Sequence, residues 1–158
     1  TVVDLIPTDA RIYPVGRLDY DTTGVLILTN DGTFANILMH PSNNISKVYM
    51  AKLKGIIKGE QINKLKEGVT IDDDTVVKAS RVKLKKLDQK TNTCYVQITI
   101  TEGKNHQVKK MFISCELNVV HLERISIGGL YLDSNLPRGY SKLLTDLDKK
   151  LIFVGKIH

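Results

Sequence analysis

The chain lacks the features that mark membrane-spanning, exported and disulfide-stabilised proteins. No apolar run approaches the length of a membrane span, and the N-terminus lacks the basic-then-apolar layout of a signal peptide. The only cysteines, Cys94 and Cys115, form neither a CxxC motif nor a plausible disulfide framework. Because each lies in a mainly apolar pattern, we expect buried free thiols in a reducing cytoplasm.

The motifs that usually bind metals and nucleotide cofactors are also missing. The segment Asn30-Asp31-Gly32 lacks the Gly-Lys-Ser/Thr of a phosphate-binding loop, and Gly128-Gly129 is not part of a GxGxxG pattern. No metal-ligand spacing such as HExxH occurs among the histidines, which are His40, His106, His121 and His158. We therefore predict no metal and no cofactor.

Size and composition are those of one soluble globular domain, with 158 residues, 42% of them hydrophobic and 25% charged. A net charge of +6 and a pI near 9.3 favour association with phosphate backbones, although a plain basic protein would look the same. The chain begins at Thr1 without an initiator methionine, and its first residues already read as folded protein. We therefore expect a fragment whose upstream residues have been removed.

The N-terminal half mixes strand and helix patterns. Val25 to Thr29 is a nearly continuous apolar run that is typical of a buried strand. Apolar residues from Phe34 to Met39 have helical spacing, and a proline follows them. Lys47 to Ile57 is again extended, and Ile62 with Leu65 predicts a short helix that Gly68 can end.

From Val69 onward the pattern predicts an antiparallel sheet. Residues 72–74 and 88–92 are typical turn segments, and residues 94–100 alternate between apolar and polar. Apolar spacing predicts a helix over residues 105–116, and residues 119–132 are rich in strand formers. We therefore predict an α+β fold with a mixed, largely antiparallel sheet flanked by helices, and no domain boundary within residues 1–158.

One loop carries two carboxylates directly before the first predicted strand. It runs Pro14-Val15-Gly16-Arg17-Leu18-Asp19-Tyr20-Asp21-Thr22-Thr23-Gly24. Asp19 and Asp21 are two residues apart, so in an extended loop they point in opposite directions, which weakens a hydrolase that uses both. The spacing alone favours a salt bridge for Asp19 and turn formation by Asp21 to Gly24, where Gly24 would permit a positive φ.

Two further segments contain polar groups that could serve a site. Glu102-Gly103-Lys104-Asn105-His106-Gln107-Val108-Lys109-Lys110-Met111-Phe112 joins the end of a strand to the start of a helix, where backbone N–H groups and cations can bind phosphate. A solvated helix face is the simpler alternative. In Lys47-Val48-Tyr49, the tyrosine is either a core aromatic or a platform on which a base stacks.

Together, these three segments resemble the three motifs of the RsuA-like family of ribosomal RNA pseudouridine synthases, in order and in spacing. The resemblance extends from about Thr1 to the segment Leu143-Leu144-Thr145 and is closer to the large-subunit rRNA branch than to the small-subunit branch. It implies the catalytic fold of that family, with a central cleft. Family members usually carry an N-terminal S4-type RNA-binding domain, and we expect this chain to depart from the family in lacking it.

The family resemblance implies isomerisation of a uridine to pseudouridine in ribosomal RNA, expected to be 23S rRNA, without a cofactor. Asp19 matches the catalytic aspartate, which acts either as a nucleophile on the uridine or as a base on its ribose. Lys109 matches a basic partner that keeps this carboxylate ionised and oriented. Tyr49 matches the aromatic residue that packs against the target base, which must be flipped out of its helix.

The resemblance also implies a set of RNA contacts. Arg17 matches a residue that helps to hold the RNA open after flipping. The expected contacts to the RNA backbone are Lys47, Lys104, Asn105, Lys110 and Arg124. We expect ribosomal RNA as the partner, no membrane association, a monomer and a cytoplasmic location. The alternatives are a non-catalytic RNA-binding module, a small-subunit rRNA substrate and, more weakly, a hydrolase using Asp19 and Asp21.

Overall fold

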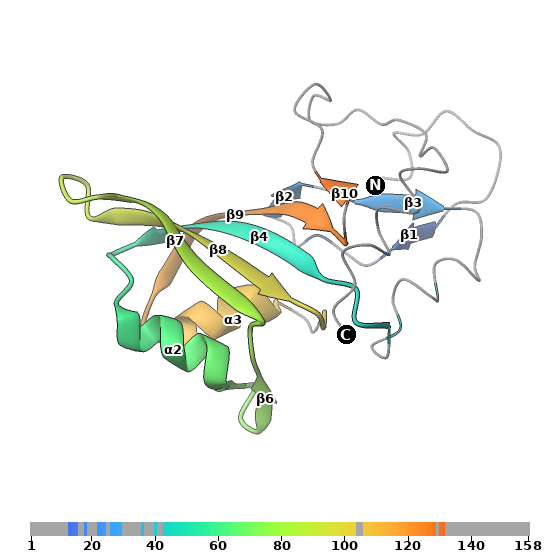
Figure 1. The fold of residues 1–158 in the computed structure, drawn as a ribbon, viewed down its shortest axis with the longest axis horizontal. Helices are drawn as coiled ribbons and strands as arrows, with labels where there is room; N and C mark the ends of the chain where they lie inside the picture. Colours follow the sequence, from blue (N-terminus) through green and yellow to red (C-terminus); the bar gives the residue numbers. More distant parts are fainter. Residues whose placement is uncertain are drawn as a thin grey trace.

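The centre of the molecule is a six-stranded sheet that is antiparallel except at one strand. The computed structural model describes residues 13–15, 18, 22–24, 26–29, 36, 40, 43–103, 106–128 and 130–131. The strands lie in the order β10 (Leu130–Tyr131), β9 (Asn118–Ile127), β4 (Lys47–Lys54), β8 (Thr93–Ile100) and β7 (Arg81–Asp88). Strand β2 (Thr22–Gly24) pairs in parallel with β9. The predicted mixed, largely antiparallel sheet is therefore confirmed (Figure 1).

Helices α2 (Gly59–Glu67) and α3 (Gln107–Ser114) cover one face of this sheet (Figure 1). The amide of Gln61 links the two helices, because its oxygen accepts a hydrogen bond from the backbone N–H of Lys58 (2.8 Å) while its nitrogen donates to the Cys115 carbonyl (2.8 Å). Helix α2 ends at Gly68, as predicted, with φ at 137°. No helix in the described part of the chain is long and apolar enough to span a membrane.

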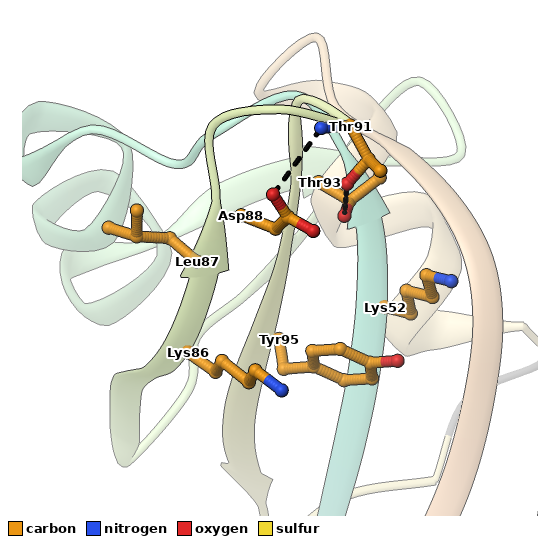
Figure 2. A pocket seen from close by; sticks show the side chains of 7 residues that line it. All are labelled: Lys52, Lys86, Leu87, Asp88, Thr91, Thr93 and Tyr95. Atoms are coloured by element: carbon orange, nitrogen blue, oxygen red, sulfur yellow. Dashed lines mark hydrogen bonds between the residues drawn. The ribbon is translucent and has the colours of Figure 1, made fainter.

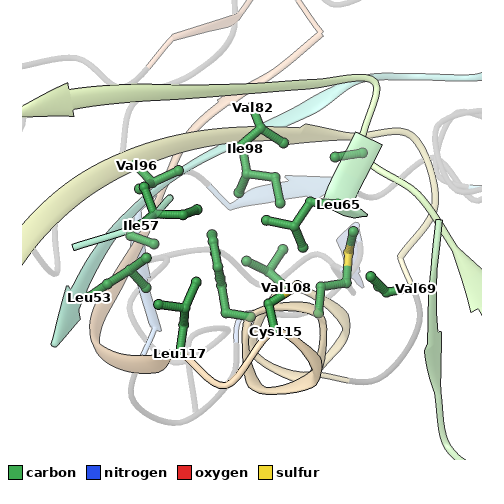
Figure 3. Packing of buried hydrophobic residues seen from close by; sticks show 14 of the residues in the cluster. Leu53, Ile57, Leu65, Val69, Val82, Val96, Ile98, Val108, Cys115 and Leu117 are labelled. Carbon is green, nitrogen blue, oxygen red and sulfur yellow. The ribbon is translucent and has the colours of Figure 1, made fainter. Parts of the chain in front are cut away.

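The hydrophobic core lies between the helices and the sheet (Figure 3). Alternating residues of β8 point into it, so Cys94, Val96, Ile98 and Ile100 are each at most 1% exposed. Met111 and Phe112 of α3 are both fully buried against this face. Burial of each such side chain contributes about 1.5–3 kcal/mol of hydrophobic stabilisation, which explains why the helices dock on this face. Cys94 and Cys115 are buried free thiols, as predicted.

Two smaller pairs of strands complete the described structure. Strands β5 (Val69–Ile71) and β6 (Thr75–Val77) form an antiparallel hairpin across the turn predicted at residues 72–74. Strands β1 (Tyr13–Val15) and β3 (Ile27–Thr29) pair antiparallel and confirm the second part of the strand predicted over residues 25–29. Most of the helix predicted over residues 34–39 lies outside the described residues.

The segment Thr22–Gly24 was predicted to form a turn, and this was wrong. It forms β2, in which Gly24 lies opposite Arg124 of β9. The positive φ expected for Gly24 is confirmed at 118°, and a Cβ atom built there would lie 2.1 Å from the Arg124 carbonyl oxygen. A glycine is therefore needed at this position for two reasons, the backbone conformation and the close approach of two strands.

Substitution of three glycines should separate the cost of a positive φ from the cost of a clash with a neighbouring strand. Gly24→Ala should lower the free energy of unfolding by about 3 kcal/mol or more, because strain and a backbone clash add. Gly55 also has a positive φ, of 96°, but has no atom within 4 Å of a built Cβ. Gly55→Ala should therefore cost only about 1–2 kcal/mol.

Gly59 is the control, because a Cβ there meets no atom within 4 Å and it opens helix α2. Gly59→Ala should leave stability unchanged or raise it by up to about 1 kcal/mol. Urea denaturation of the three variants provides the measurement. Equal stability of the Gly24 and Gly59 variants would contradict the close packing of β2 on β9.

Candidate functional site

Strands β4 and β9 bring three predicted site residues to the same sheet face. Tyr49 lies between Ile98 of β8 and Arg124 of β9 in the strand register, and Lys47 lies two residues before it on β4. Facing residues of paired strands point to the same side, which here is the side that packs against the helices. Tyr49 is half-buried and packs against the apolar core. On this side of the sheet, the polar side chains of Lys47, Tyr49 and Arg124 therefore lie next to the apolar core.

Arg124 lies inside the protein rather than on its surface. Its exposed fraction is 2%, and the backbone of β2 lies against its own backbone at Gly24. The direct phosphate contact predicted for Arg124 does not fit this burial, because a guanidinium group must reach the surface to bind an RNA backbone. A buried guanidinium contributes a fixed positive charge to the interior next to Tyr49.

Lys47 is also partly withdrawn from water. Its Nζ atom lies beside Gly103, 3.6 Å from where a Cβ of that residue would be. Burial lowers the pKa of Lys47 below its ordinary value of 10.5, and the positive charge of Arg124 lowers it further, while the carboxylate of Glu102 opposes both. Lys47 is therefore partly buried, with a second cation, Arg124, and one carboxylate, Glu102, close enough to affect its charge.

The start of α3 is tied to the end of β8 by a contact that sequence reasoning missed. The Gln107 amide is 3% exposed and donates a hydrogen bond to the Glu102 carboxylate (3.1 Å), with the Met111 sulfur 3.7 Å away. This bond sets the position of Glu102, whose charge acts on Lys47. The sequence carries no periodic signal for a pair five residues apart across a loop.

Lys109 and Lys110 lie in the first turn of α3 and are both half-buried. Lys110 forms an ion pair with Asp72 of the β5–β6 turn, with 2.7 Å between Nζ and a carboxylate oxygen. Since the two side chains are 30% and 52% exposed, this pair contributes at most about 1 kcal/mol to stability. It offsets part of the charge with which Lys110 was predicted to bind RNA.

Four predicted site residues, Arg17, Asp19, Lys104 and Asn105, lie outside the described residues. Their roles stay predictions. Gly24, which ends the motif containing Asp19, is described and lies against Arg124. Among the described residues, no group of three or more His, Cys, Asp or Glu side chains is placed to hold a metal ion.

A family model for RNA pseudouridylate synthase matches residues 2–114, which is more than half of the chain. The chain therefore belongs to the RNA pseudouridylate synthase family. It is 50% identical over 140 residues to the ribosomal large subunit pseudouridine synthase B of Bacillus subtilis, covering 89% of this chain and 57% of that protein. The protein of the same name from Vibrio vulnificus is 36% identical over 141 residues, covering 88% of this chain and 43% of the relative. The predicted resemblance to the large-subunit branch is confirmed.

Solved structures show the same fold. A crystal structure of a pseudouridylate synthase matches with a TM-score of 0.85 at 30% identity, covering 96% of this chain and 65% of that chain. The structure of an H/ACA ribonucleoprotein bound to a substrate RNA containing 2′-deoxyuridine matches with a TM-score of 0.61 at 13% identity, covering 84% of this chain and 42% of the other. At that identity, the second match shows the fold alone. The chain spans about half the length of the two curated relatives described above.

The environment of Lys47 predicts a pH-dependent stability. A lysine whose pKa is lowered by folding binds fewer protons in the native state than in the unfolded state. It therefore lowers the free energy of unfolding by its full amount at neutral pH, and this effect disappears as pH rises toward 10.5. We expect Lys47→Met to melt at the same temperature as the wild type or higher at pH 7, and this difference to fall as pH approaches 10.5.

Lys54→Met is the matched control, because Lys54 lies at the exposed end of the same strand. Its effect on stability should stay within about 0.5 kcal/mol. Melting curves followed by circular dichroism between pH 7 and pH 10 provide the measurement. A destabilised Lys47→Met variant, or a difference that grows with pH, would contradict the assignment of burial as the main influence on Lys47.

Proposed function

We propose that this protein converts a uridine to pseudouridine in ribosomal RNA of the large subunit. The observation that carries this proposal is the 50% identity, over 140 residues, to a ribosomal large subunit pseudouridine synthase B. The match to the family model supports it further, because residues 2–114 include all three sequence motifs. The basic net charge of +6 suits a polyanionic substrate.

The proposed reaction is an isomerisation and needs no oxidant, reductant or cofactor. The bond between N1 of uracil and C1′ of ribose breaks, the base turns, and C5 forms a new bond to C1′. The proton on C5 leaves and N1 gains one, so atoms and electrons balance. In this proposal Asp19 supplies the carboxylate, either by attack on the nucleoside or by removal of a ribose proton.

The polar face described above would support that carboxylate electrostatically. Arg124 and Lys47 add positive charge from within the fold, where water screens them less than at the surface. Lys109 is proposed as the direct basic partner of Asp19. Together these cations favour the ionised carboxylate over the neutral acid, which is the form that either chemical role requires.

Tyr49 is proposed to contact the flipped uracil. Its ring is held by neighbours on both sides of β4 and by the core, yet it remains partly exposed. A ring that is already fixed loses little conformational freedom when a base packs against it. That contact would offset part of the few kcal/mol that unstacking a nucleotide costs.

Several further aspects belong to this proposal. We propose Arg17 as the residue that holds the opened RNA, and Lys47, Lys104, Asn105 and Lys110 as contacts to its backbone. We also propose a monomer that works in the cytoplasm without a metal. A small-subunit rRNA substrate and a non-catalytic RNA-binding module remain the alternatives, and both give distinct results in the experiments that follow.

Replacement of Asp19 tests the chemistry directly. Asp19→Asn should lower kcat for pseudouridine formation by roughly 1,000-fold or more while RNA binding stays near the wild-type level, because shape is kept and the charge is lost. Pseudouridine mapping in 23S and 16S rRNA incubated with the protein provides the measurement. Asp21→Asn is the control, with an expected loss of less than about tenfold.

Modification that persists in Asp19→Asn would show that Asp19 is not the catalytic carboxylate. A wild type that binds rRNA but forms no pseudouridine would support the RNA-binding module. Equal losses in the Asp19 and Asp21 variants would show that both carboxylates are needed, and a wild type that cleaves the RNA without forming pseudouridine would support the hydrolase. Pseudouridine found only in 16S rRNA would show that the substrate is the small-subunit rRNA.

Lys109 and Lys110 provide a matched pair, since they are adjacent, equally charged and both half-buried. Lys109→Ala should lower kcat by roughly 100-fold, because the proposed partner of Asp19 is lost. Lys110→Ala should mainly weaken RNA binding and reduce its salt dependence. Single-turnover kinetics at saturating rRNA separate the two effects. Similar kcat values for both variants would contradict the special role of Lys109.

A further inference from the structure

The sheet has a second face, on the side opposite helices α2 and α3 (Figure 1). On β4, residues that alternate with the site residues point to this side, including Met50, Lys52 and Lys54. At one end the face is closed, because Val48, Thr99 and Ser126 are all buried. Toward the other end it is open, and its side chains are partly or fully exposed to solvent.

The open part has a row of three residues from neighbouring strands. In the register, Tyr95 of β8 lies between Lys52 of β4 and Lys86 of β7. Figure 2 shows the two lysines on either side of the tyrosine ring, and the Lys52 ammonium is 5.9 Å from the ring centroid. A half-buried aromatic ring between two cations can accept a stacked base while the cations contact phosphates.

A hollow of about 220 Å³ lies next to this row. It is smaller than the roughly 300–1,000 Å³ typical of sites for drug-sized ligands, so it suits one base or one phosphate. Its far end is closed by a turn in which the Asp88 carboxylate accepts hydrogen bonds from the backbone N–H groups of Lys90 (3.0 Å) and Thr91 (3.4 Å). The lining residues are Lys52, Lys86, Leu87, Asp88, Thr91, Thr93 and Tyr95 (Figure 2).

Among the described residues of this face, cations outnumber carboxylates. The carboxylates are Asp88, which caps its own turn, and Glu123, which accepts a hydrogen bond from the Thr23 hydroxyl (3.3 Å). His121 of β9 lies opposite Lys52 and contacts the same hydroxyl (3.5 Å). The basic residues on this side of β4 and β7 are Lys52, Lys54, Arg81, Lys83 and Lys86.

Protection of the sheet edge explains only some of these charges. Strand β7 is at the edge of the sheet, where lysines discourage pairing with another chain. Strands β4 and β8 are inside the sheet, so this reason does not apply to Lys52 or to Tyr95. Their position beside Lys86 and the hollow calls for another explanation.

We propose that the open sheet face around Lys52, Tyr95 and Lys86 is a second RNA-binding surface. It takes a single-stranded segment of RNA, with one base on the Tyr95 ring and the flanking phosphates on the two lysines. The surface lies on the opposite side of the sheet from Tyr49 and Arg124, so it holds the RNA without touching the reacting uridine. The choice of RNA as the ligand rests on the proposed function.

The test measures binding of a short fluorescein-labelled oligouridylate by anisotropy over a range of salt concentrations. The double variant Lys52→Gln/Lys86→Gln should reduce the slope of log K against log salt by about 1.4, since each phosphate contact to a single strand contributes roughly 0.7. Tyr95→Thr keeps a residue suited to a strand and should weaken binding about fivefold or more. Tyr95→Phe keeps the ring and should stay within about twofold of the wild type.

Lys64→Gln/Lys66→Gln is the charge-matched control, because both lysines are exposed on α2 at the helical side. It should leave the slope unchanged. Equal losses in the two double variants would overturn the proposal in favour of a general charge effect. Unchanged binding in Lys52→Gln/Lys86→Gln and Tyr95→Thr would overturn it outright, and so would equally strong competition by polyglutamate, which would indicate an acidic protein as the occupant.

Measurement of pseudouridine formation separates this proposal from the proposed function. At saturating rRNA, Tyr95→Thr should form pseudouridine at the wild-type rate, because only binding is weakened. If the wild-type protein forms no pseudouridine while the variants change RNA binding as expected, the proposed function is wrong and the RNA-binding surface is supported. If the wild type is active and the binding changes do not occur, the surface alone is wrong. Circular dichroism melting curves verify that each variant is folded.

Discussion

The pairing of β4 with β8 on one side and β9 on the other is the constraint on which both faces of this protein depend. These backbone ladders place Tyr49 between Ile98 and Arg124, and they place Lys52 next to Tyr95. Since successive side chains of a strand point to opposite sides, a slip of one residue would exchange the two faces. The buried Ala51 and Leu53, which are both fully inaccessible, prevent that slip by anchoring β4 to the core.

Electrostatics in the fold follow from this arrangement. Arg124 is nearly inaccessible, and Lys47 is close enough for its pKa to be lowered by that charge. Burial of cations costs free energy, and their presence on one face fits the proposal that this face holds a negatively charged group. Glu102, held by Gln107, limits the local excess of positive charge. The other face carries its cations at the surface, where binding to an anion costs less desolvation.

Most of the fold could be predicted from the sequence because local patterns decide it. Alternation over residues 94–100 and apolar spacing in the helix at Gln107–Ser114 both reflect burial on one side of a regular element. The strand at Thr22–Gly24 was missed because its residues favour turns locally and pair in parallel with residues one hundred positions later in the chain. The burial of Arg124 was missed for a similar reason, since an arginine next to a glutamate in a strand-forming segment gives no local sign of being inside.

For the candidate site, the sequence by itself determined the family, through three motifs whose order and spacing are read directly from the chain, and it pointed to Tyr49 and Lys109. Only the tertiary structure decided which groups share a face. It placed Arg124 beside Tyr49, Gly24 against Arg124, and Lys110 in an ion pair with Asp72. The physical reason is that motif chemistry depends on residue types along the chain, whereas burial and charge coupling depend on contacts between strands that are far apart in sequence.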